Sequence, residues 1–520
     1  MWRVKSLDAI LATAEKKSLH RSLGAFQLTM LGIGGIIGTG IFVLTAEAAQ
    51  KAGPGMMVSF IIAGFVCAVA ALCYAELASM VPVSGSAYTY SYAVLGEFFA
   101  WLVGWALILE YAVAASAVAV GWSGYMVGLI EASLHTELPL AFTAGPYAGG
   151  IVNLPAIVIS LAVTGLLILG TKESATVNSV LVIVKVAALA AFIWLALPVI
   201  NDDNFKPFAP LGSTGVVAAA ASIFFAYVGF DAVSTAAEET KNPQRNIPIG
   251  LIGSLIICTI FYMLVAAGAI GAYGAQPVFG PGGEALAPGS VMLAEQCSSL
   301  AGAGKMPLVC SKEALAHVMR ELGHPMVGKF IGLAAGIALP SVILMMIYGQ
   351  TRIFFVMSRD GLLPPALSKV HPKFKTPHIV TMITGVGVTF AAAFLPVGKL
   401  ADISNSGTLF AFLMVSIAVM MLRVKQPDRA RPFRTPLVWV IAPVAAAGTV
   451  VLFFFLPHDA KLLFPVWSAI GLVLYFAYGY RKSYVGRGIT DVPELAEDAP
   501  PTAVAPMPGA PAPGSKEERD

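Results

Sequence analysis

The chain has 520 residues, of which 57% are hydrophobic and only 12% are charged, and its mean hydropathy is +0.80. Soluble domains usually carry about 25% charged residues, so the composition excludes an ordinary soluble protein. The formal net charge of +3 is too small to indicate a nucleic-acid partner. The composition therefore predicts an integral membrane protein.

Long apolar runs recur along the whole chain. A helix needs about 20 mostly apolar residues to cross a bilayer, and twelve runs approach or exceed this length. We therefore expect an all-α integral membrane protein with twelve transmembrane helices. Their predicted bounds are 25–48, 55–79, 97–127, 151–171, 177–199, 213–237, 248–273, 328–356, 378–395, 403–422, 437–456 and 463–480.

The distribution of basic residues predicts the orientation. If the N-terminus is inside, most lysines and arginines fall in cytoplasmic segments, including the clusters within 369–375 and 423–434. This agrees with the positive-inside rule and places both termini in the cytoplasm. Residues 1–21 are polar and basic, and the apolar run after them is too long for a cleavable signal. We expect the first helix to direct insertion.

The longest connection between spans, residues 274–325, is predicted to lie outside the membrane. Its Gly- and Pro-rich stretches indicate flexible loops, and residues 311–323 could form a short interfacial helix. Cys297 and Cys310 share this segment. An oxidising exterior would allow them to form a disulfide, and otherwise they are two free thiols.

The first predicted span contains the sequence LGIGGIIGTGIF (31–42), with glycines at 32, 34, 35, 38 and 40. Each glycine costs a helix interior about 1 kcal/mol relative to alanine. The sixth span is also interrupted, at Gly229 and Asp231. Two glycine-interrupted spans at matching positions of two five-span halves indicate inverted repeats with a binding site between them.

A break in a membrane helix exposes N–H groups that attract an anion and carbonyl groups that attract a cation. A zwitterionic amino acid needs both. A nucleotide-binding loop is a poor alternative, because no strand precedes the glycines and no GxxxxGK[ST] motif occurs. Close packing through the GxxxG pair Gly34 and Gly38 does not explain the second break. No rings of charges suggest a channel filter.

Six segments resemble the cationic amino acid transporter family of the amino acid–polyamine–organocation superfamily, as found in bacterial members. They are MLGIGGIIGTGIFVLT (30–45), VPVSGSAYTYSY (81–92), WALILEY (105–111), VNSVLVIVKVAAL (177–189), FFAYVGFDAVSTAAEETKNPQRNIP (224–248) and GQTRIFFVMSRDGLLP (349–364). The resemblance implies a LeuT-like 5+5 inverted repeat. In that fold, helices 1 and 6 are unwound at mid-membrane and two further helices are appended.

The resemblance also suggests a division of the chain. We expect a cytoplasmic N-terminal segment (1–24) and a transport core (25–422) in which spans 1–5 and 6–10 are inverted repeats. Spans 11–12 (423–480) and a disordered Pro/Ala-rich cytoplasmic tail (481–520) follow. The implied location is the plasma membrane, the bacterial inner membrane. The implied partners are an L-amino acid and the lipid bilayer, for a monomer or homodimer with or without a small membrane subunit.

The activity implied by the resemblance is secondary active import of L-amino acids by proton-coupled symport with alternating access. Small neutral substrates such as alanine are favoured, because Met346 leaves room for small or medium side chains. The alternatives are an amino acid exchanger, a cationic amino acid or polyamine transporter, and an amino acid sensor. An enzyme is not expected, since the seven histidines fall in loops or at span ends without a catalytic set or metal cluster.

The family's binding residues can be placed on this sequence. The amides of Thr39 and Gly40 would hold the substrate carboxylate, and main-chain carbonyls would hold its ammonium group. The full set of expected substrate-binding residues is Ile36, Thr39, Gly40, Phe225, Ala226, Val228 and Met346.

Charges within the predicted spans are candidates for coupling. In this family a lysine replaces the coupling cation of sodium-dependent relatives, so Lys185 would contact the first break near Gly34 and also Ser341. We therefore expect no sodium site, no metal and no cofactor, with a proton as the coupling ion. The alternative for Lys185 is snorkelling to the interface. Glu110 and Asp231 would relay protons or brace the broken helices.

Two aromatic and three acidic residues are candidates for gates of the transport path. Tyr227 and Phe230 are either gates over the substrate or core aromatics. Glu76, Glu238 and Glu239 are candidates for gate or loop salt bridges, with Arg352 and Arg359 as suggested partners.

Overall fold

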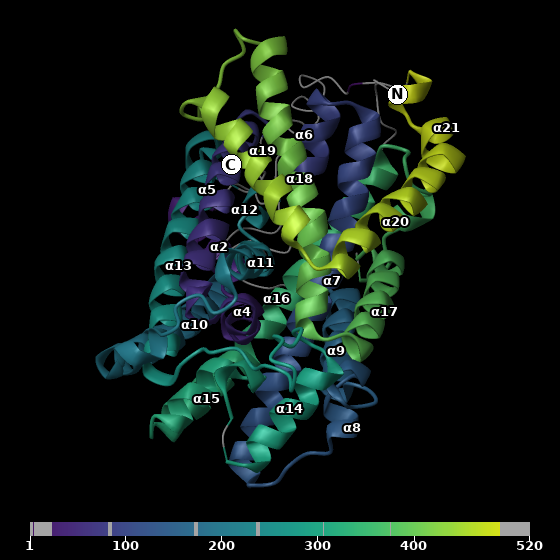
Figure 1. The fold of residues 1–520 in the computed structure, drawn as a ribbon. Helices are drawn as coiled ribbons and strands as arrows, with labels where there is room; N and C mark the ends of the chain where they lie inside the picture. The colour runs from purple at the N-terminus through teal and green to yellow at the C-terminus, as the bar shows by residue number, and fades with distance from the viewer. Residues whose placement is uncertain are drawn as a thin grey trace, which may run out of the picture.

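The computed structural model describes residues 4, 23–81, 86–170, 175–235, 240–304, 306–374 and 376–488. These residues form a helical bundle, and the described part of the chain contains only isolated β-bridges and no strands (Figure 1). The first half contains α2 (Ala25–Ile36), α3 (Thr39–Phe42), α4 (Leu44–Ala52), α5 (Met56–Met80), α6 (Ser86–Val94), α7 (Glu97–Leu134), α8 (Leu140–Thr143), α9 (Leu154–Leu169), α10 (Ala175–Ala196), α11 (Gly212–Ile223) and α12 (Ala232–Thr235).

The second half contains α13 (Pro243–Tyr273), α14 (Val291–Gly302), α15 (Ala314–Glu321), α16 (Pro325–Arg359), α17 (His378–Phe394), α18 (Val397–Lys425), α19 (Val438–Phe455), α20 (His458–Leu474) and α21 (Tyr480–Lys482). Short 3₁₀ turns connect several of these helices, among them η5 (Phe224–Tyr227).

Eight helical segments of the described chain are long and apolar enough to cross a membrane, and four apolar helices are shorter. The shorter ones are Ala25–Ile36, Leu154–Leu169, Gly212–Tyr227 and His378–Phe394. The all-α class is therefore confirmed, while the count of twelve spans and the repeat symmetry stay predictions. Large apolar side chains such as Trp194 and Val473 are 80% and 68% exposed, as expected of a surface that faces lipid.

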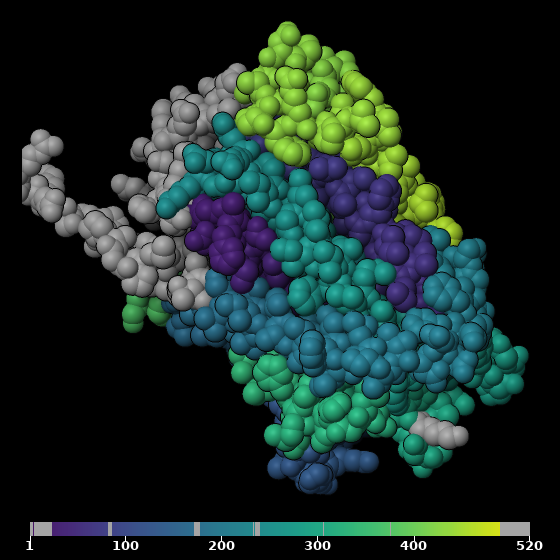
Figure 2. All heavy atoms as spheres, turned by 90° about the vertical axis from the view of Figure 1, so that its left-hand side faces the viewer, coloured from purple at the N-terminus to yellow at the C-terminus, as the bar shows by residue number. Residues whose placement is uncertain are grey.

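The centre of the bundle is built around α7, which packs against α16, α17 and α18. On the face shown in Figure 2, α13 contacts both α2 and α5, and α10 lies against α13. Small residues permit the close approach. A Cβ added to Gly32 in α2 would lie 2.4 Å from the hydroxyl oxygen of Ser254 in α13. This packing fixes α2, the segment that carries most of the glycine run.

The segment 274–325 is more ordered than its composition suggests. Its predicted helix is present as α15, but α14 was not predicted, and Cys297 and Cys310 form a disulfide. Gln50 of α4 joins the segment to the bundle, since its side-chain nitrogen donates to the carbonyls of Val278 and Leu286 at 2.8 and 2.9 Å. The expectation of a loop over 298–305 is therefore wrong for residues 298–302, which belong to α14.

The chain is also folded beyond α20. Residues 481–488 were assigned to the disordered tail, yet Ser483 is buried and donates to the carboxylate of Glu97 at the start of α7. The hydroxyls of Tyr92 and Tyr475 donate to the same carboxylate at 3.1 and 3.0 Å. These contacts hold the end of the last helix against the bundle. The rest of the tail (489–520) and the N-terminal residues 5–22 lie outside the described residues.

Candidate functional site

The glycine run interrupts its helix where the sequence predicts. Helix α2 ends at Ile36, and the chain continues through Ile37 and Gly38 before α3 begins at Thr39. The backbone of Ile37 is extended, with φ −72° and ψ 90°, so the helix ends here, although the N–H of Ile37 still donates to the carbonyl of Ile33 at 2.8 Å. The depth of this interruption in the membrane stays a prediction.

The second interruption follows α11. The helix tightens into the 3₁₀ turn η5, Val228 is extended, and Gly229 has φ +114° before α12 begins at Ala232. Residues that carry a side chain rarely adopt such a positive φ, so glycine is required at this position. The chain thus leaves its helical geometry at Val228 and Gly229, while the unwinding of this helix at mid-membrane stays a prediction.

The two interruptions touch each other through their glycines. A Cβ added to Gly229 would lie 2.8 Å from the carbonyl carbon of Gly35, and one added to Gly40 would lie 2.3 Å from the Cα of Ala226. By contrast, a Cβ on Gly38 would meet only a methyl group of Val342, at 3.7 Å. The glycines at 35, 40 and 229 therefore permit close approach of two main chains, whereas Gly38 has room for a side chain.

Main-chain carbonyls of the two breaks converge on one hydroxyl group. The hydroxyl oxygen of Tyr262 in α13 lies 2.8 Å from the carbonyl oxygen of Ile36 and 2.9 Å from that of Ala226. A phenol has a single proton, so it can donate to only one of these oxygens at a time. The carbonyl of Phe225, another expected ligand, accepts the N–H of Val228 at 3.2 Å. Two of the predicted ammonium ligands are thus close together and share one donor.

The opposite side of the first break offers donors. Thr39 and Gly40 form the first turn of α3, where N–H groups have no acceptor within the helix. The hydroxyl of Thr39 is fully buried and has no hydrogen-bond partner among the described residues. Gly121 of α7 packs directly on this side chain, since an added Cβ would lie 2.3 Å from Thr39 Cγ2. An unsatisfied buried hydroxyl beside free helix N–H groups is suited to a polar ligand.

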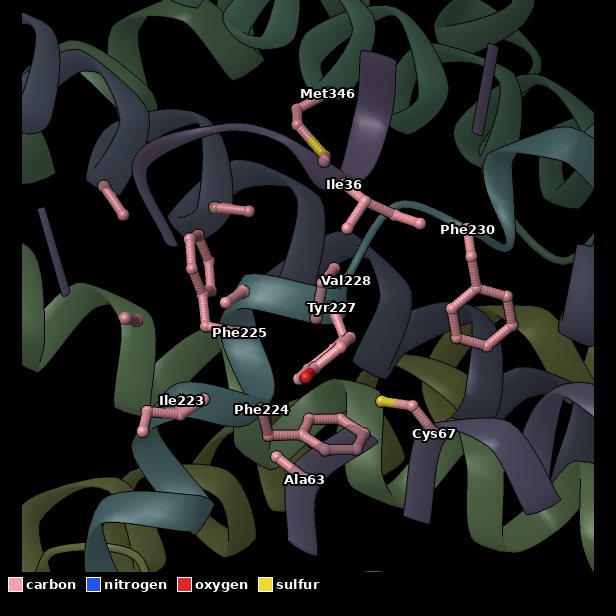
Figure 3. Close-up of a cluster of buried hydrophobic side chains, with 14 of the residues drawn as sticks. Ile36, Ala63, Cys67, Ile223, Phe224, Phe225, Tyr227, Val228, Phe230 and Met346 are labelled. Carbon is pink, nitrogen blue, oxygen red and sulfur yellow. The ribbon is translucent and has the colours of Figure 1, made fainter. Parts of the chain in front are cut away.

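Apolar side chains surround these polar groups. Figure 3 shows Ile36, Phe225, Val228 and Met346 in one buried cluster, with Met346 directed toward Ile36. Met346 belongs to α16, which also brings Val342 next to Gly38 and Met345 next to Gly35. The structure therefore brings the expected side-chain contact Met346 to the first break, together with two neighbours that were not predicted.

Lys185 reaches the first break from α10. Its side chain is 1% exposed, and Nζ donates to the carbonyl oxygen of Gly34 at 3.0 Å. This position disfavours snorkelling, which would carry the ammonium group toward water. Ser341 donates to the carbonyl of Ala338 in its own helix at 2.8 Å. The carbonyl contact lies where the sequence placed it, and the pairing with Ser341 stays a prediction.

Two carboxyl groups are buried near the breaks. Glu110 of α7 is 1% exposed, and neither of its carboxyl oxygens has a hydrogen-bond partner among the described residues. Asp231, just after the second break, accepts a hydrogen bond from Tyr111 at 3.2 Å and interacts electrostatically with Glu110. An ionised carboxylate without a partner is much more costly to bury than its protonated form. A proton-relay role for these two groups, as opposed to bracing of the broken helices, stays a prediction.

The aromatic residues of the second break lie in the core. Phe230 contacts the rings of Tyr74 and Phe412, with ring centroids 6.1 and 5.2 Å away. Tyr227 packs on Tyr262 at 5.3 Å and donates to the carbonyl of Phe60 at 3.0 Å. Both side chains are fully buried, so in this conformation they act as core aromatics. A gating role stays a prediction.

The salt bridge of Glu76 has other partners than those suggested. Arg423 binds its carboxylate in a bidentate manner at 2.8 Å for each oxygen, and Arg431 Nε lies 3.2 Å away. The main-chain N–H of Thr435 donates to the same group at 2.8 Å. Arg352 instead contacts Tyr348 of its own helix. Because these arginines are far from Glu76 in the sequence, only the fold could identify them. Glu238 and Glu239 lie outside the described residues.

The family assignment rests on sequence comparison. The model of the amino acid permease family matches residues 23–477. The chain belongs to this amino acid permease family. It is 46% identical to the branched-chain amino acid permease BcaP of Bacillus subtilis (strain 168), over 93% of this chain and 98% of that protein. It is also 42% identical to the methylthioribose transporter of the same organism, over 94% of this chain and 99% of that protein.

Plant relatives support the same assignment. The chain is 34% identical to cationic amino acid transporter 9, chloroplastic, of Arabidopsis thaliana, over 90% of this chain and 79% of that protein. The relatives are named as permeases and transporters, which are not enzymes. The protein is thus a multi-pass membrane permease, and the resemblance to cationic amino acid transporters is confirmed.

Sequence reasoning missed two polar features of this permease. One is Tyr262, whose hydroxyl bridges the breaks and which reads in the sequence as an ordinary aromatic residue of an apolar span. The other is a buried cluster in which Asp402 of α18 binds Lys51 of α4 at 3.1 Å and Ser222 of α11 at 2.5 Å. An aspartate immediately before the tenth predicted span was the available signal for the second feature.

Proposed function

We propose that this permease is a secondary active transporter that imports L-amino acids by proton-coupled symport with alternating access, and that it favours small neutral substrates such as alanine. The observation that carries the proposal is the convergence of the Ile36 and Ala226 carbonyls on the hydroxyl of Tyr262. An ammonium group has three donors and can satisfy both oxygens at once, which the phenol cannot. A substrate ammonium would therefore replace this hydroxyl.

The substrate carboxylate would bind on the other side of the same break. The N–H groups of Thr39 and Gly40 carry partial positive charge, and the buried hydroxyl of Thr39 needs a partner. These groups lie next to the carbonyls that would hold the ammonium, because Ile36 and Thr39 flank the two-residue interruption. The α-carbon of a zwitterion would then lie between Thr39 and Ile36, with its side chain directed toward Met346.

Coupling to protons would use the buried charges. Lys185 donates to Gly34 of the same break, which ties its ammonium group to the conformation of α2. The carboxyl oxygens of Glu110 have no hydrogen-bond partner in the described part of the chain, and this group would alternate between a protonated and an ionised state as water gains access. With Lys185 at the place of the coupling cation of relatives, the proposal needs no sodium ion, metal or cofactor.

The remaining expectations belong to the same proposal. The two five-helix halves of residues 25–422 would move against each other as inverted repeats, with 423–480 appended. Both termini would lie in the cytoplasm of a protein of the bacterial plasma membrane, which is either a monomer or a homodimer. The concentration of basic residues in the segment 423–434 supports this orientation.

The decisive experiment is uptake into proteoliposomes, with and without an inward-directed proton gradient, across the twenty L-amino acids. Alanine should accumulate only with the gradient, and alanine amide and ethylamine should not compete, because each lacks the carboxylate. Valine, leucine, isoleucine and methylthioribose test the substrates in the relatives' names. Exchange of internal for external amino acid without net uptake would show an antiporter and not a symporter. Amino acid binding without any flux would indicate a sensor.

The size of the side-chain pocket can be tested at Met346. Replacing it by serine removes most of a buried side chain beside the first break, and Met346→Ser should therefore admit arginine or lysine. Competition by these amino acids against labelled alanine measures the change. Met326→Ser is the matched control, since that methionine is 74% exposed. An unchanged substrate profile for Met346→Ser would remove this residue from the pocket.

A further inference from the structure

A groove on the surface of the bundle is not used by the proposed transport mechanism. It has a volume of about 590 Å³ and lies between the first half of α13 and the segment that follows α18. On the face shown in Figure 2, teal α13 lies below the yellow-green surface near residue 430. The lining residues are Gln244, Arg245, Pro248, Ile249, Ile252, Gly253, Ile256, Pro432 and Phe433.

The walls of the groove are apolar along most of its length. Ile249, Ile252 and Ile256 are spaced by three and four residues, so they share one face of α13. Ile249 and Ile256 remain 43% and 56% exposed, on a helix that is long and apolar enough to cross a membrane. Pro432 and Phe433 form the opposite wall. This part of the groove is suited to a hydrocarbon chain.

The mouth of the groove is cationic. Arg245 and Gln244 lie in the first turn of α13, where the main-chain N–H of Arg245 donates to the carbonyl of Asn242 at 3.0 Å and the side chains supply the remaining donors. Both side chains are exposed, and Arg245 forms no salt bridge with a described residue. Arg434 follows Phe433 and is also exposed. The mouth therefore offers a guanidinium group and amide donors to an anion.

The opposite wall has a fixed position. Glu76 binds Arg423, Arg431 and the main chain of Thr435, so the segment that carries Phe433 is held on both sides of the groove residues. The N–H of Phe433 also donates to the hydroxyl of Ser79 at 3.3 Å. Because both arginines are engaged with Glu76, the cation available among the lining residues is Arg245.

We propose that this groove binds an anionic phospholipid, with its phosphate at Arg245 and one acyl chain along Ile249, Ile252 and Ile256. The dimensions support a lipid over a free phosphate or a soluble ligand. Eleven residues separate Arg245 from Ile256, which is about 16 Å along a helix. Half of a bilayer's hydrocarbon core is about 15 Å thick. An anionic headgroup matches the cationic mouth of the groove, and an acyl chain as long as one leaflet is thick matches its apolar walls.

The test uses the full-length purified protein in detergent. Binding of phosphatidylglycerol and phosphatidylcholine with identical acyl chains is measured by native mass spectrometry and by the shift in unfolding temperature. Phosphatidylglycerol should bind more tightly and raise the unfolding temperature, and phosphatidylcholine should not. Glycerol phosphate and inorganic phosphate, which lack an acyl chain, should give no shift. A shift from these ions equal to that from the lipid would overturn the proposal in favour of a free-anion site.

Three variants locate the binding. Arg245→Gln should weaken phosphatidylglycerol binding about fivefold, the contribution of one cation near an anionic headgroup. Ile256→Trp narrows the apolar part at an exposed position that does not endanger folding, and it should weaken both lipids. Arg481→Gln removes an exposed charge outside the groove and should leave binding unchanged. Equal losses for Arg245→Gln and Arg481→Gln, or no loss for Ile256→Trp, would contradict a site in this groove.

Discussion

Glu76 and Glu110 are equally buried, at 1% exposure each, but their surroundings differ. The Glu76 cluster, at the end of α5, surrounds the carboxylate with two arginines and a main-chain N–H group. Near the breaks, both carboxyl oxygens of Glu110 are without a hydrogen bond among the described residues. Burying an ionised carboxylate is costly unless cations and hydrogen bonds offset the loss of water, and such partners are present at Glu76 but not, among the described residues, at Glu110. The comparison separates structural charge from charge available for coupling.

The largest expected effect is on stability, at Glu76. Glu76→Ala leaves Arg431 buried without its counter-charge, and removing one partner of a buried ion pair typically costs about 3–5 kcal/mol. Thermal unfolding in detergent should show a large decrease in the midpoint temperature. Asp428→Ala, at an exposed position of the same segment, is the control and should have little effect. A normal midpoint for Glu76→Ala would mean that the cluster is not structural.

At Lys185, next to the first break, the expected effect is on transport. Lys185→Ala should abolish concentrative uptake, reducing the accumulation ratio to about one, because the ammonium group on Gly34 is lost. Uptake driven by a proton gradient in proteoliposomes measures this ratio. Lys206→Ala, whose side chain is 74% exposed in the parent, should accumulate substrate normally. Full accumulation by Lys185→Ala would exclude the coupling role.

The contact between the two breaks can be tested with a matched pair of glycines. Gly40→Ala would place a Cβ 2.3 Å from the main chain of Ala226, and such overpacking costs about 1–3 kcal/mol. This clash would push the first break away from Ala226 in the second break. The Ala226 carbonyl would then no longer lie near the amides of Thr39 and Gly40, so uptake should fall at least tenfold. Gly38→Ala has 3.7 Å to its nearest neighbour and should remain active. Equal activity of both variants would argue against the close approach.

The smallest expected effect on stability is at Glu110. Glu110→Gln keeps the shape of the side chain and removes its ability to change charge, so the free energy of unfolding should stay within about 1 kcal/mol of the parent. Proton-driven accumulation should nevertheless be lost, while exchange of internal for external substrate persists. Uptake and exchange assays at several pH values separate these activities. Glu284→Gln, at an exposed position, is the control. If uptake by Glu110→Gln still depended on pH, the residue that carries the coupled proton would have to be a different one.

Much of the fold follows from local sequence chemistry. The helical class was predictable because apolar runs of spanning length have few other structures available in a membrane. The positions of both breaks were predictable because five clustered glycines and Gly229 weaken a helix wherever they occur. Helix α14 and the folded residues 481–488 were not predicted. Their order depends on partners distant in the sequence, such as the contact between Ser483 and Glu97.

The sequence by itself determined that this protein is a helical membrane permease with two interrupted helices and buried charges at Glu110, Lys185 and Asp231. Only the tertiary structure decided which charges are satisfied. It paired Glu76 with Arg423 and Arg431, placed Lys185 on the carbonyl of Gly34, and brought Tyr262 between the two breaks. The physical reason is that a residue's apolarity and helix propensity are local properties. Burial and hydrogen-bond satisfaction depend on groups that only folding brings together.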